Sequence, residues 1–369
     1  MPTRPWLRWL VPFAAVFAIA ATTLVAGNAS ADEKLPPRSA EQLLVDLQQA
    51  QLDGFSGIVR QSADLGIPAL PGVSEHGADF SSLISGTHTL RVAYAGPDKS
   101  KVALLGDLSE SSVIRNGSEV WTWSSRDNEV THAEVDKAAL ADHQRPEDLP
   151  ADAPKTPQEA AARFLSEVGP TTEVSVATDT TVAGRAAYEL VLQPKDAGSL
   201  LSSVRIAVDG TEHVAVRVQV FAGGRAEPVA SIGFNEVDFS TPADSVFTFS
   251  PPKGARVTEV TPEDDADELD EDADTRRTAE PEVIGEGWIT VVVGTLPTGG
   301  LPDAQTDEQS GERGEGPDLQ AYLAQLPTVS GSWGSGRLLA GTAFSVVITD
   351  DGRYAAGAVA PKLLYDALG

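Results

Sequence analysis

Residues Val204–Ala255 read VRIAVDGTEHVAVRVQVFAGGRAEPVASIGFNEVDFSTPADSVFTFSPPKGA. Four valines of this stretch lie two residues apart and therefore point to one face of a strand: Val214, Val216, Val218 and Val220. Ile232 with Phe234, and Phe247 with Phe249, repeat the same spacing. The stretch predicts a long antiparallel sheet with one apolar face, and such a face needs a cover. What lies on the valines therefore decides both the fold and the function.

The N-terminus has the three parts of an export signal. Arg4 and Arg8 precede the apolar run Trp9–Ala26, and small residues lead to a cleavage site after Ala31. Residues 1–31 are therefore predicted to be a signal peptide, which places the protein outside the cytoplasm, either secreted or in the cell envelope. The alternative is an uncleaved N-terminal membrane anchor, for which the apolar run is long enough.

The composition excludes several kinds of protein. The chain has no cysteine, so disulfides, thiol catalysis and cysteine metal ligands are ruled out. The formal net charge of −27 becomes −29 once Arg4 and Arg8 leave with the signal. So acidic a chain is repelled by nucleic acid and by anionic lipid surfaces. Any contact with lipid is then expected to be apolar and held in a pocket.

Residues 32–256 are predicted to form one domain dominated by strands. A helix over Ser39–Asp53 has Ser39 as its N-cap, and a second helix opens at Thr156-Pro157 and runs to about Val168. Turn signals such as Asn116-Gly117 separate the strands. The expected strands are Phe55–Arg60, Leu90–Tyr94, Lys101–Leu105, Ser111–Arg115, Glu119–Trp123, Val130–Glu134, Glu173–Ala177, Ala186–Leu192, Val204–Asp209, His213–Phe221, Ala230–Phe239 and Val246–Ser250.

An acidic block ends this domain. Ten acidic residues and no basic one lie between Glu259 and Asp274, and blocks of like charge repel and stay disordered. A linker is therefore predicted over residues 257–285; the alternative is a calcium site, although the spacing fits no calcium-binding loop. Residues 286–369 are predicted to be a small α+β unit. Its expected elements are a strand at Trp288–Gly294, a helix at Leu319–Leu326, a flexible turn at Ser330–Gly336, a hairpin of Ala343–Thr349 and Tyr354–Val359, and a helix at Pro361–Leu368.

The sequence contains no motif for catalysis, for a cofactor or for a metal. The five histidines are scattered and none has a partner at metal-ligand spacing: His76, His88, His132, His143 and His213. There is no nucleophile elbow and no phosphate-binding glycine loop. We therefore expect a protein that is not an enzyme and has no cofactor; a hydrolase is the remaining enzymatic alternative, for which no nucleophile–base pair is visible.

An apolar cavity is the functional site that the sequence favours. Ala63–Gly86 is too apolar for a solvated loop, so we expect it to fold back over the sheet with Phe80–Ile84 as a short helix. Together with Asp196–Ser203 it would form the mouth of a cavity under the sheet. The alternative is a core filled completely by the protein's own helices. The candidate ligand-binding residues are Leu70, Phe80, Leu83, Ile84, Leu90, Val92, Tyr94, Trp121, Trp123, Leu200 and Leu201.

Several segments, taken in order, give the chain a resemblance to a known family. Its signal, first helix and Phe55–Arg60 resemble the LolA/LolB/RseB-like exported proteins, most closely the LolA-like proteins of high-GC bacteria. Leu104-Leu105-Gly106-Asp107, Asn116–Trp123 and the closing Phe247–Ala255 resemble them too. The resemblance covers about residues 39–257. It implies a curved, incomplete antiparallel barrel with helices plugging its concave side.

The same resemblance implies a function without catalysis. A lipid or lipoprotein acyl chain would lie between barrel and helices, in a carrier or sensor of the cell envelope. LolA has an arginine near its lid, for which Arg60 and Arg91 are the candidates here. The C-terminal unit is absent from LolA, and Trp288 with Leu296-Pro297 resembles the small second domain of RseB-like regulators. The alternative partner is therefore the outer part of a membrane anti-sigma factor.

Overall fold

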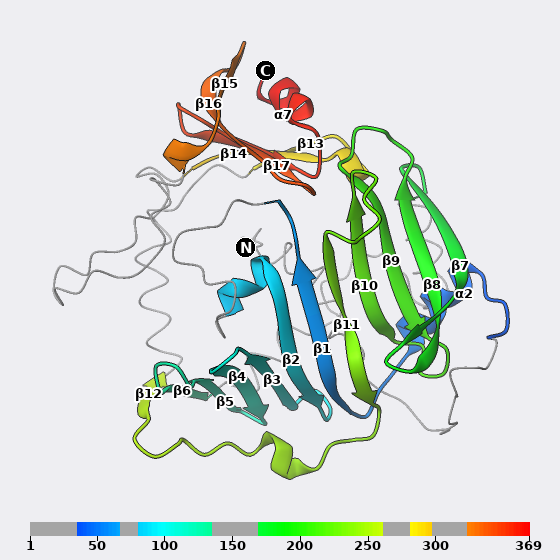
Figure 1. Cartoon of the computed structure of the whole chain (residues 1–369), viewed down its shortest axis with the longest axis vertical. Helices are drawn as coiled ribbons and strands as arrows, with labels where there is room; N and C mark the ends of the chain where they lie inside the picture. Colours follow the sequence, from blue (N-terminus) through cyan, green and yellow to red (C-terminus); the bar gives the residue numbers. More distant parts are fainter. Residues whose placement is uncertain (1–34, 67–79, 135–168, 261–280, 297–322) are drawn as a thin grey trace, which may run out of the picture.

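A computed structural model describes residues 35–66, 80–134, 169–260, 281–296 and 323–369. Two antiparallel sheets contain its strands (Figure 1). None of the helices in these ranges is long and apolar enough to cross a membrane. The predicted signal peptide, Leu70, the helix expected after Thr156, and the acidic run 261–280 lie outside the described residues.

The larger sheet has twelve strands in the order β12-β6-β5-β4-β3-β2-β1-β11-β10-β9-β8-β7. All neighbours pair antiparallel except β12, which runs parallel to β6. The predicted curved antiparallel sheet is therefore confirmed. Its strands are β1 (Phe55–Ala63), β2 (Gly86–Tyr94), β3 (Lys99–Leu105), β4 (Glu110–Asn116), β5 (Glu119–Ser124), β6 (Glu129–Glu134), β7 (Thr172–Val182), β8 (Arg185–Pro194), β9 (Leu201–Asp209), β10 (Ala215–Ala222), β11 (Ala230–Asp238) and β12 (Arg256–Val260).

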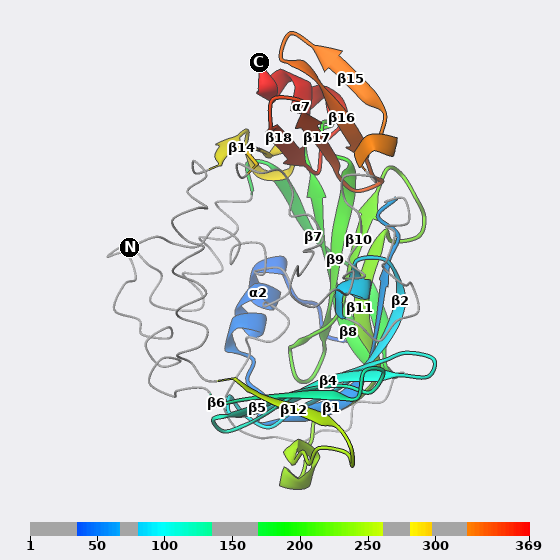
Figure 2. The ribbon, with the colours of Figure 1, turned by 90° about the vertical axis from the view of Figure 1, so that its left-hand side faces the viewer.

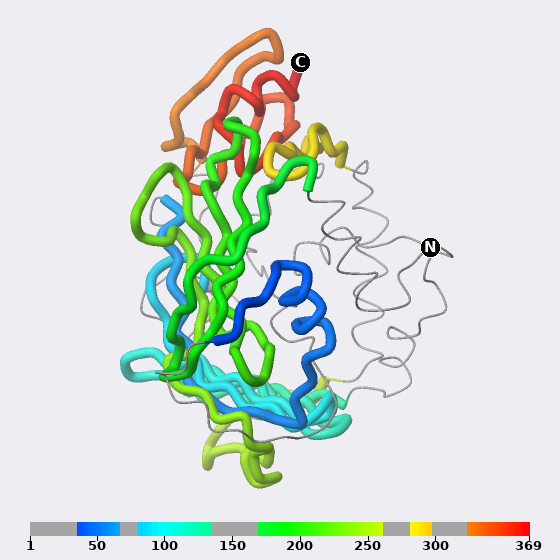
Figure 3. Tube along the Cα trace, turned by 90° about the vertical axis from the view of Figure 1, so that its right-hand side faces the viewer, coloured from blue at the N-terminus to red at the C-terminus, as the bar shows by residue number. Residues whose placement is uncertain are grey.

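The sheet bends sharply and encloses a helix in its concave side. Strands β7 to β11 stand upright, whereas β4, β5, β6 and β12 lie across their lower end (Figure 2). Helix α2 (Ala40–Gln49) lies within this angle, as the chain trace also shows (Figure 3). Its Leu43 is fully buried and packs with Tyr188 of β8 and Val208 of β9. The open, plugged half-barrel therefore covers part of its own apolar face.

Ser39 caps α2 as the sequence predicts. Its Oγ accepts the backbone N–H of Gln42 at 3.2 Å, and the side chain of Gln42 accepts the N–H of Ser39 at 2.9 Å. This reciprocal pair satisfies two of the N–H groups that a helix start leaves unpaired. The helix ends at Gln49 rather than Asp53, because Ala50 already has extended backbone.

Of the four alternating valines, Val216, Val218 and Val220 lie in β10 and Val214 directly precedes it, but the end of Val204–Ala255 does not form a strand. Phe247 belongs to a short 3-10 helix, η4 (Asp244–Phe247), and is 1% exposed. Phe249 follows in irregular backbone and packs on Trp121 and Trp123. The predicted strand Val246–Ser250 is therefore wrong. The next strand of the large sheet is β12, whose residues 257–260 lie in the segment predicted as linker.

The smaller sheet has six strands in the order β13-β14-β18-β17-β16-β15, and a helix packs on β14, β17 and β18. Helix α7 (Pro361–Leu368) has the predicted bounds, with Pro361 at its start, and buries Leu364 and Leu368. The flexible turn expected at Ser330–Gly336 is wrong, because most of it forms the hairpin of β15 and β16. The elements are β13 (Glu282–Ile284), η5 (Gly287–Ile289), β14 (Val291–Thr295), β15 (Thr328–Gly331), β16 (Gly334–Ala340), β17 (Ser345–Thr349), β18 (Arg353–Gly357) and α7.

Candidate ligand cavity

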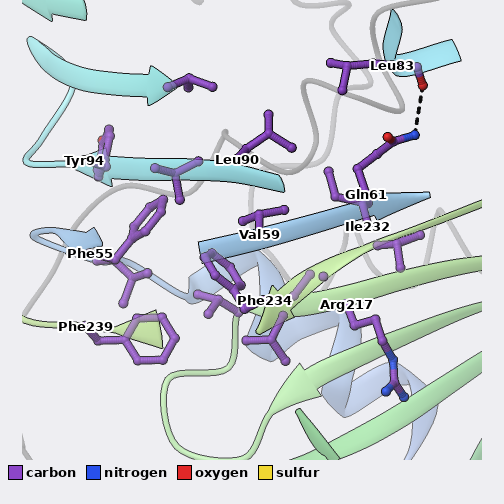
Figure 4. Close-up of a pocket in the computed structure, with 18 of the residues that line it drawn as sticks. Phe55, Val59, Gln61, Leu83, Leu90, Tyr94, Arg217, Ile232, Phe234 and Phe239 are labelled. Atoms are coloured by element: carbon purple, nitrogen blue, oxygen red, sulfur yellow. Dashed lines mark hydrogen bonds between the residues drawn. The ribbon is translucent and has the colours of Figure 1, made fainter. Parts of the chain in front are cut away.

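An apolar cavity of about 250 Å³ lies in the concave face of the large sheet. Strands β1, β2, β3, β10 and β11 form its walls, and η2 (Phe80–Ile84) closes one side (Figure 4). The lining residues are Leu52, Phe55, Val59, Gln61, Phe80, Leu83, Leu90, Val92, Tyr94, Val102, Val214, Ala215, Val216, Arg217, Val218, Ile232, Gly233, Phe234 and Phe239. The valine face is therefore covered only in part by the described residues.

Strand register brings the aromatic side chains together at one end of the cavity. Phe55 pairs with Tyr94 of β2, and their rings stack with centroids 5.6 Å apart. The ring of Phe234 meets that of Phe55 edge-on at 5.9 Å. Stacked and edge-to-face contacts of this kind fix ring orientation beyond what area burial does. These contacts set the orientation of the aromatic rings at this end of the wall.

Gly57 makes the approach of Phe234 possible. A Cβ on Gly57 would lie 3.0 Å from the ring of Phe234 and would collide with the backbone oxygen of Glu236. Only glycine therefore fits opposite β11 at this point.

Three polar side chains belong to the cavity wall. Arg217 is one, but its guanidinium is directed to β8 and β7, where it lies 3.2 Å from Glu189 and 3.3 Å from the hydroxyl of Thr180. Tyr94 is the second, and burial raises the pKa of its phenol, so the ring stays neutral. Gln61 is the third, and its amide donates to the carbonyl of Leu83 at 2.9 Å. Among the described residues, no acid and no histidine lines the cavity.

Five of the predicted site residues lie together in the cavity wall: Phe80, Leu83, Leu90, Val92 and Tyr94. Their role in binding stays a prediction. Ile84 is 42% exposed and lies outside the lining. Leu200 is also outside it: its backbone N–H donates to the carbonyl of Ala358 in the small unit. Leu201 lines a different groove, described below.

Trp121 and Trp123 lie away from the cavity, which corrects their expected position. Both pack on Phe249, and Trp121 also stacks on His132 at 3.8 Å. The physical reason is that the chain after β11 comes back to the large sheet, where β12 pairs with β6. Phe249, just before β12, therefore packs on the two tryptophan rings and covers them. Neither Arg60 nor Arg91 lines the cavity, since both are exposed on their strands.

Fourteen of the nineteen described lining residues were not among the predicted site residues, and four of them illustrate why. Leu52 and Phe239 lie at the ends of a predicted helix and a predicted strand, out of phase with the apolar residues of either, and the structure places both just outside those elements. Gln61 and Arg217 are polar, so an apolar pattern passes over them. The only signal for Gln61 was its place on the strand, two residues after Val59 on the same face.

A second groove, of about 950 Å³, lies between the two sheets. Leu192 and Leu201 of the large sheet face it, as do Val292, Val346 and Ala356 of the small one. The sheets are joined beside it, where Ser199 pairs with Val359 in an antiparallel bridge. Trp288 Nε1 also donates to Thr172 Oγ1 at 2.7 Å.

Metal chemistry has no visible support in the described ranges. No group of three or more histidine and acidic side chains there has the geometry to hold a metal ion. The closest approach of histidine to acids is at His132, whose two ring nitrogens face Glu119 and Glu259 on opposite sides. Opposed nitrogens of one ring cannot coordinate one ion together.

Comparison with known proteins returns distant structural neighbours. No protein-family model matches the chain, and no curated protein matches it. The complex of MucA and MucB from Pseudomonas aeruginosa is 11% identical, with 89% of this chain and 94% of that chain covered and a TM-score of 0.40. A LolA superfamily protein from Nitrosomonas europaea is 12% identical, with 58% of this chain and 99% of that chain covered and a TM-score of 0.20. An uncharacterized conserved protein from Thermus thermophilus is 10% identical, with coverages of 60% and 99% and a TM-score of 0.33. At these identities and scores the likeness assigns neither a family nor a function.

Proposed function

We propose that this protein is a non-enzymatic, extracytoplasmic carrier or sensor that binds an acyl chain of a lipid or lipoprotein in the cavity. The observation that carries the proposal is the 250 Å³ space between the valine face, β1, β2 and η2, lined by apolar side chains except at three positions. Apolar clefts with a few placed polar groups are the usual form of small-ligand sites. The described wall contains no acid and no histidine, which suits binding without chemistry.

The size of the cavity sets how much of a chain it encloses. An apolar protein cavity of about 150 Å³ takes up benzene, so 250 Å³ holds about ten carbon atoms of an alkyl chain in proportion. Burial of that many methylene groups contributes about 8 kcal/mol before the cost of association is subtracted. The rest of a longer chain, and its polar head, would extend beyond the cavity.

Leu83→Glu against Ile84→Glu is the direct test. Leu83 lines the cavity, whereas its neighbour Ile84 lies outside it and is 42% exposed. A charge at residue 83 must be desolvated when an alkyl chain enters, so uptake of a fluorescent fatty acid should fall at least tenfold. Ile84→Glu should bind as the wild type does.

Lipid carried through purification gives a second measurement. Protein exported by a bacterial host should retain lipid in native mass spectra, and Leu83→Glu should retain less. Wild-type protein that is free of lipid and takes up no added fatty acid would overturn the proposal.

The groove between the sheets favours a second function: binding of an outer segment of a membrane protein such as an anti-sigma factor. Its described walls come from both sheets and present mainly apolar and small residues, with Glu286 as their one acid. A photo-crosslinker at Val292 in the groove should capture such a segment in the producing cell. The same group at Leu108, which is fully exposed between β3 and β4 and lies outside the groove, is the control. Equal capture at both positions would exclude the groove as the docking site.

A further inference from the structure

Gln61 is a buried amide in an apolar wall, and only half of it is satisfied. Its side chain lies on β1 and lines the cavity, yet the residue is only 8% exposed. Its Nε2 donates to the carbonyl oxygen of Leu83 in η2 at 2.9 Å. The opposite orientation of the amide would set two oxygens against each other, so this bond fixes which end of the amide is free.

The free end is the oxygen. Gln61 Oε1 is buried and has no hydrogen-bond partner among the described residues. Figure 4 shows the amide nitrogen turned to Leu83 and the oxygen on the other side of the group, the side on which Leu90 lies in that view. Buried polar atoms are almost always paired, and one without a partner is expensive to keep. An unpaired, buried acceptor on a residue of the cavity wall therefore points to a donor that arrives with a ligand.

The surroundings narrow the chemistry of that donor. The described wall of the cavity has no acid to balance an ammonium group, and its one cation, Arg217, is held by Glu189. A cationic donor would therefore be buried without a counter-charge, which is unfavourable. A neutral hydroxyl or amide N–H fits an acceptor of this kind.

The position of Gln61 also narrows where the donor lies along the ligand. Gln61 and Leu83 lie at the η2 side of the cavity, whereas Phe55 and Tyr94 lie at the far end of the same strand pair (Figure 4). Six residues of extended strand separate Gln61 from Phe55, a span of about 20 Å. Apart from Arg217, which is held by Glu189, the described wall between them is apolar; Gln61 Oε1 is the acceptor at the η2 end and the Tyr94 hydroxyl is the polar group at the other end.

We propose that Gln61 determines the specificity of the cavity: its Oε1 accepts a hydrogen bond from an uncharged hydroxyl or amide N–H borne by the apolar ligand. This rests on the proposed function and goes further, because it names the ligand as an alkyl chain with one neutral donor rather than a plain hydrocarbon chain. A chain without the donor leaves Oε1 unpaired and incurs the cost of its continued burial.

Three small compounds test the inference on the wild-type protein: dodecan-1-ol, dodecanamide and 1-methoxydodecane. The first two carry a neutral donor on a twelve-carbon chain, and the ether has the same chain with an acceptor only. Each is titrated against a bound fluorescent fatty acid. The alcohol, the amide or both should displace the dye at about tenfold lower concentration than the ether, the effect of one neutral hydrogen bond. The larger of the two preferences tells whether a hydroxyl or an amide is the better donor.

Gln61→Met removes the acceptor and keeps a side chain of similar length and flexibility. The ratio between alcohol and ether should fall to about one in this variant, while the ether itself still binds. Arg60→Met is the matched control, because Arg60 is the preceding residue on β1 and is exposed outside the cavity. Its ratio should equal that of the wild type.

The outcomes separate the two proposals. Equal displacement by all three compounds in the wild type overturns the role of Gln61 and leaves the acyl-chain cavity standing. Displacement by none of them, with no binding of the fatty acid, overturns the cavity function and the role of Gln61 together. A preference that persists in folded Gln61→Met assigns the acceptor to another group and overturns the inference as well.

Discussion

The guanidinium of Arg185 donates hydrogen bonds to both carboxylate oxygens of Asp209, with Nε 2.6 Å from Oδ2 and a terminal nitrogen 3.0 Å from Oδ1. Asp209 also accepts the backbone N–H groups of Thr211 and Glu212 in the turn between β9 and β10. The other face of Arg185 lies over Phe239, 4.7 Å from the ring centre, and Phe239 lines the cavity. The ion pair therefore links a strand turn to the cavity wall.

We predict that Asp209→Asn destabilises the fold by about 2–3 kcal/mol. Breaking a fully buried ion pair costs about 3–5 kcal/mol. We expect a smaller loss of about 2–3 kcal/mol here, because the Arg185 side chain is 21% exposed and can be solvated in part. Urea unfolding monitored by circular dichroism measures the change. Asp366→Asn, which removes an exposed helical pair with Lys362, should cost under about 0.5 kcal/mol. Equal effects of the two variants would contradict the structural role of Asp209.

The same pair predicts how stability depends on acid. Burial by itself raises the pKa of Asp209, but the hydrogen bonds from Arg185, Glu212 and Thr211 outweigh it and bring the pKa below its ordinary value. A carboxylate with a lowered pKa stabilises the fold above the unfolded pKa of about 3.9, and this contribution is lost as the pH falls through the lower, folded value. Unfolding free energies measured from pH 6 to pH 2 should therefore fall less steeply in Asp209→Asn than in the wild type.

Gly57→Ala should destabilise the sheet at the cavity. The new Cβ would meet the carbonyl oxygen of Glu236 and the ring of Phe234, and a backbone oxygen in a paired strand has little freedom to move. Overpacking of this kind costs about 1–3 kcal/mol, so thermal melting should shift down by several degrees. Ser56→Ala on the same strand serves as the control and should stay within about 0.5 kcal/mol of the wild type. An unchanged melting temperature for Gly57→Ala would show that β1 and β11 are not held this closely.

Local patterns predicted most of the fold. The Asn116-Gly117 turn joins β4 to β5, and Ser39 and Pro361 start α2 and α7 as predicted. These features depend on neighbours in sequence, which a pattern contains. The spacing of Phe247 and Phe249 led to a wrong strand prediction, because the two rings make separate contacts. Phe247 is buried at the end of η4, and Phe249 packs on Trp121 and Trp123.

Contacts between segments far apart in the chain could not be predicted from the sequence. Strand β12 pairs parallel with β6, more than a hundred residues earlier, and no local signal specifies that partner. In the candidate site, the apolar wall of β2 was predicted through Leu90, Val92 and Tyr94. The polar member, Gln61, was not, because its meaning depends on the carbonyl of Leu83 twenty-two residues away.

From the contacts of His132 we predict that the attachment of β12 to the large sheet depends on pH. Its Nδ1 lies 2.6 Å from Glu259 of β12, and its Nε2 contacts Glu119 of β5. Burial alone lowers the pKa of His132, but the hydrogen bonds to Glu119 and Glu259 outweigh it and raise the pKa above its usual value. The stabilisation is therefore fully present below the unfolded pKa of about 6.5 and is lost as the pH rises through the folded value.

Hydrogen exchange of the β12 amides, corrected for intrinsic rates, measures how firmly β12 is attached to the sheet. Protection of β12 should weaken from pH 6 to pH 9, while that of β8, near the opposite end of the same sheet, stays constant. His132→Gln should remove the pH dependence and lower protection at pH 6. The Arg256–Glu129 ion pair remains in that variant, so β12 should not detach completely. Protection that is the same at all pH values would mean that the histidine does not hold the strand.

From the hydrogen bond of the Trp288 indole we predict a measurable coupling free energy between Trp288 and Thr172, which lie on the two sides of the contact between the sheets. Its Nε1 donates to the hydroxyl of Thr172, which is 4% exposed at the start of β7. Trp288→Phe removes the donor, and Thr172→Val removes the acceptor while keeping the shape. A double-mutant cycle on urea unfolding should therefore give a coupling of about 1 kcal/mol, the net value of one neutral hydrogen bond. If the two changes simply add, this bond contributes nothing to joining the sheets, and their attachment depends on other contacts, among them the Ser199–Val359 bridge and the hydrogen bonds Leu200–Ala358 and Thr342–Leu65.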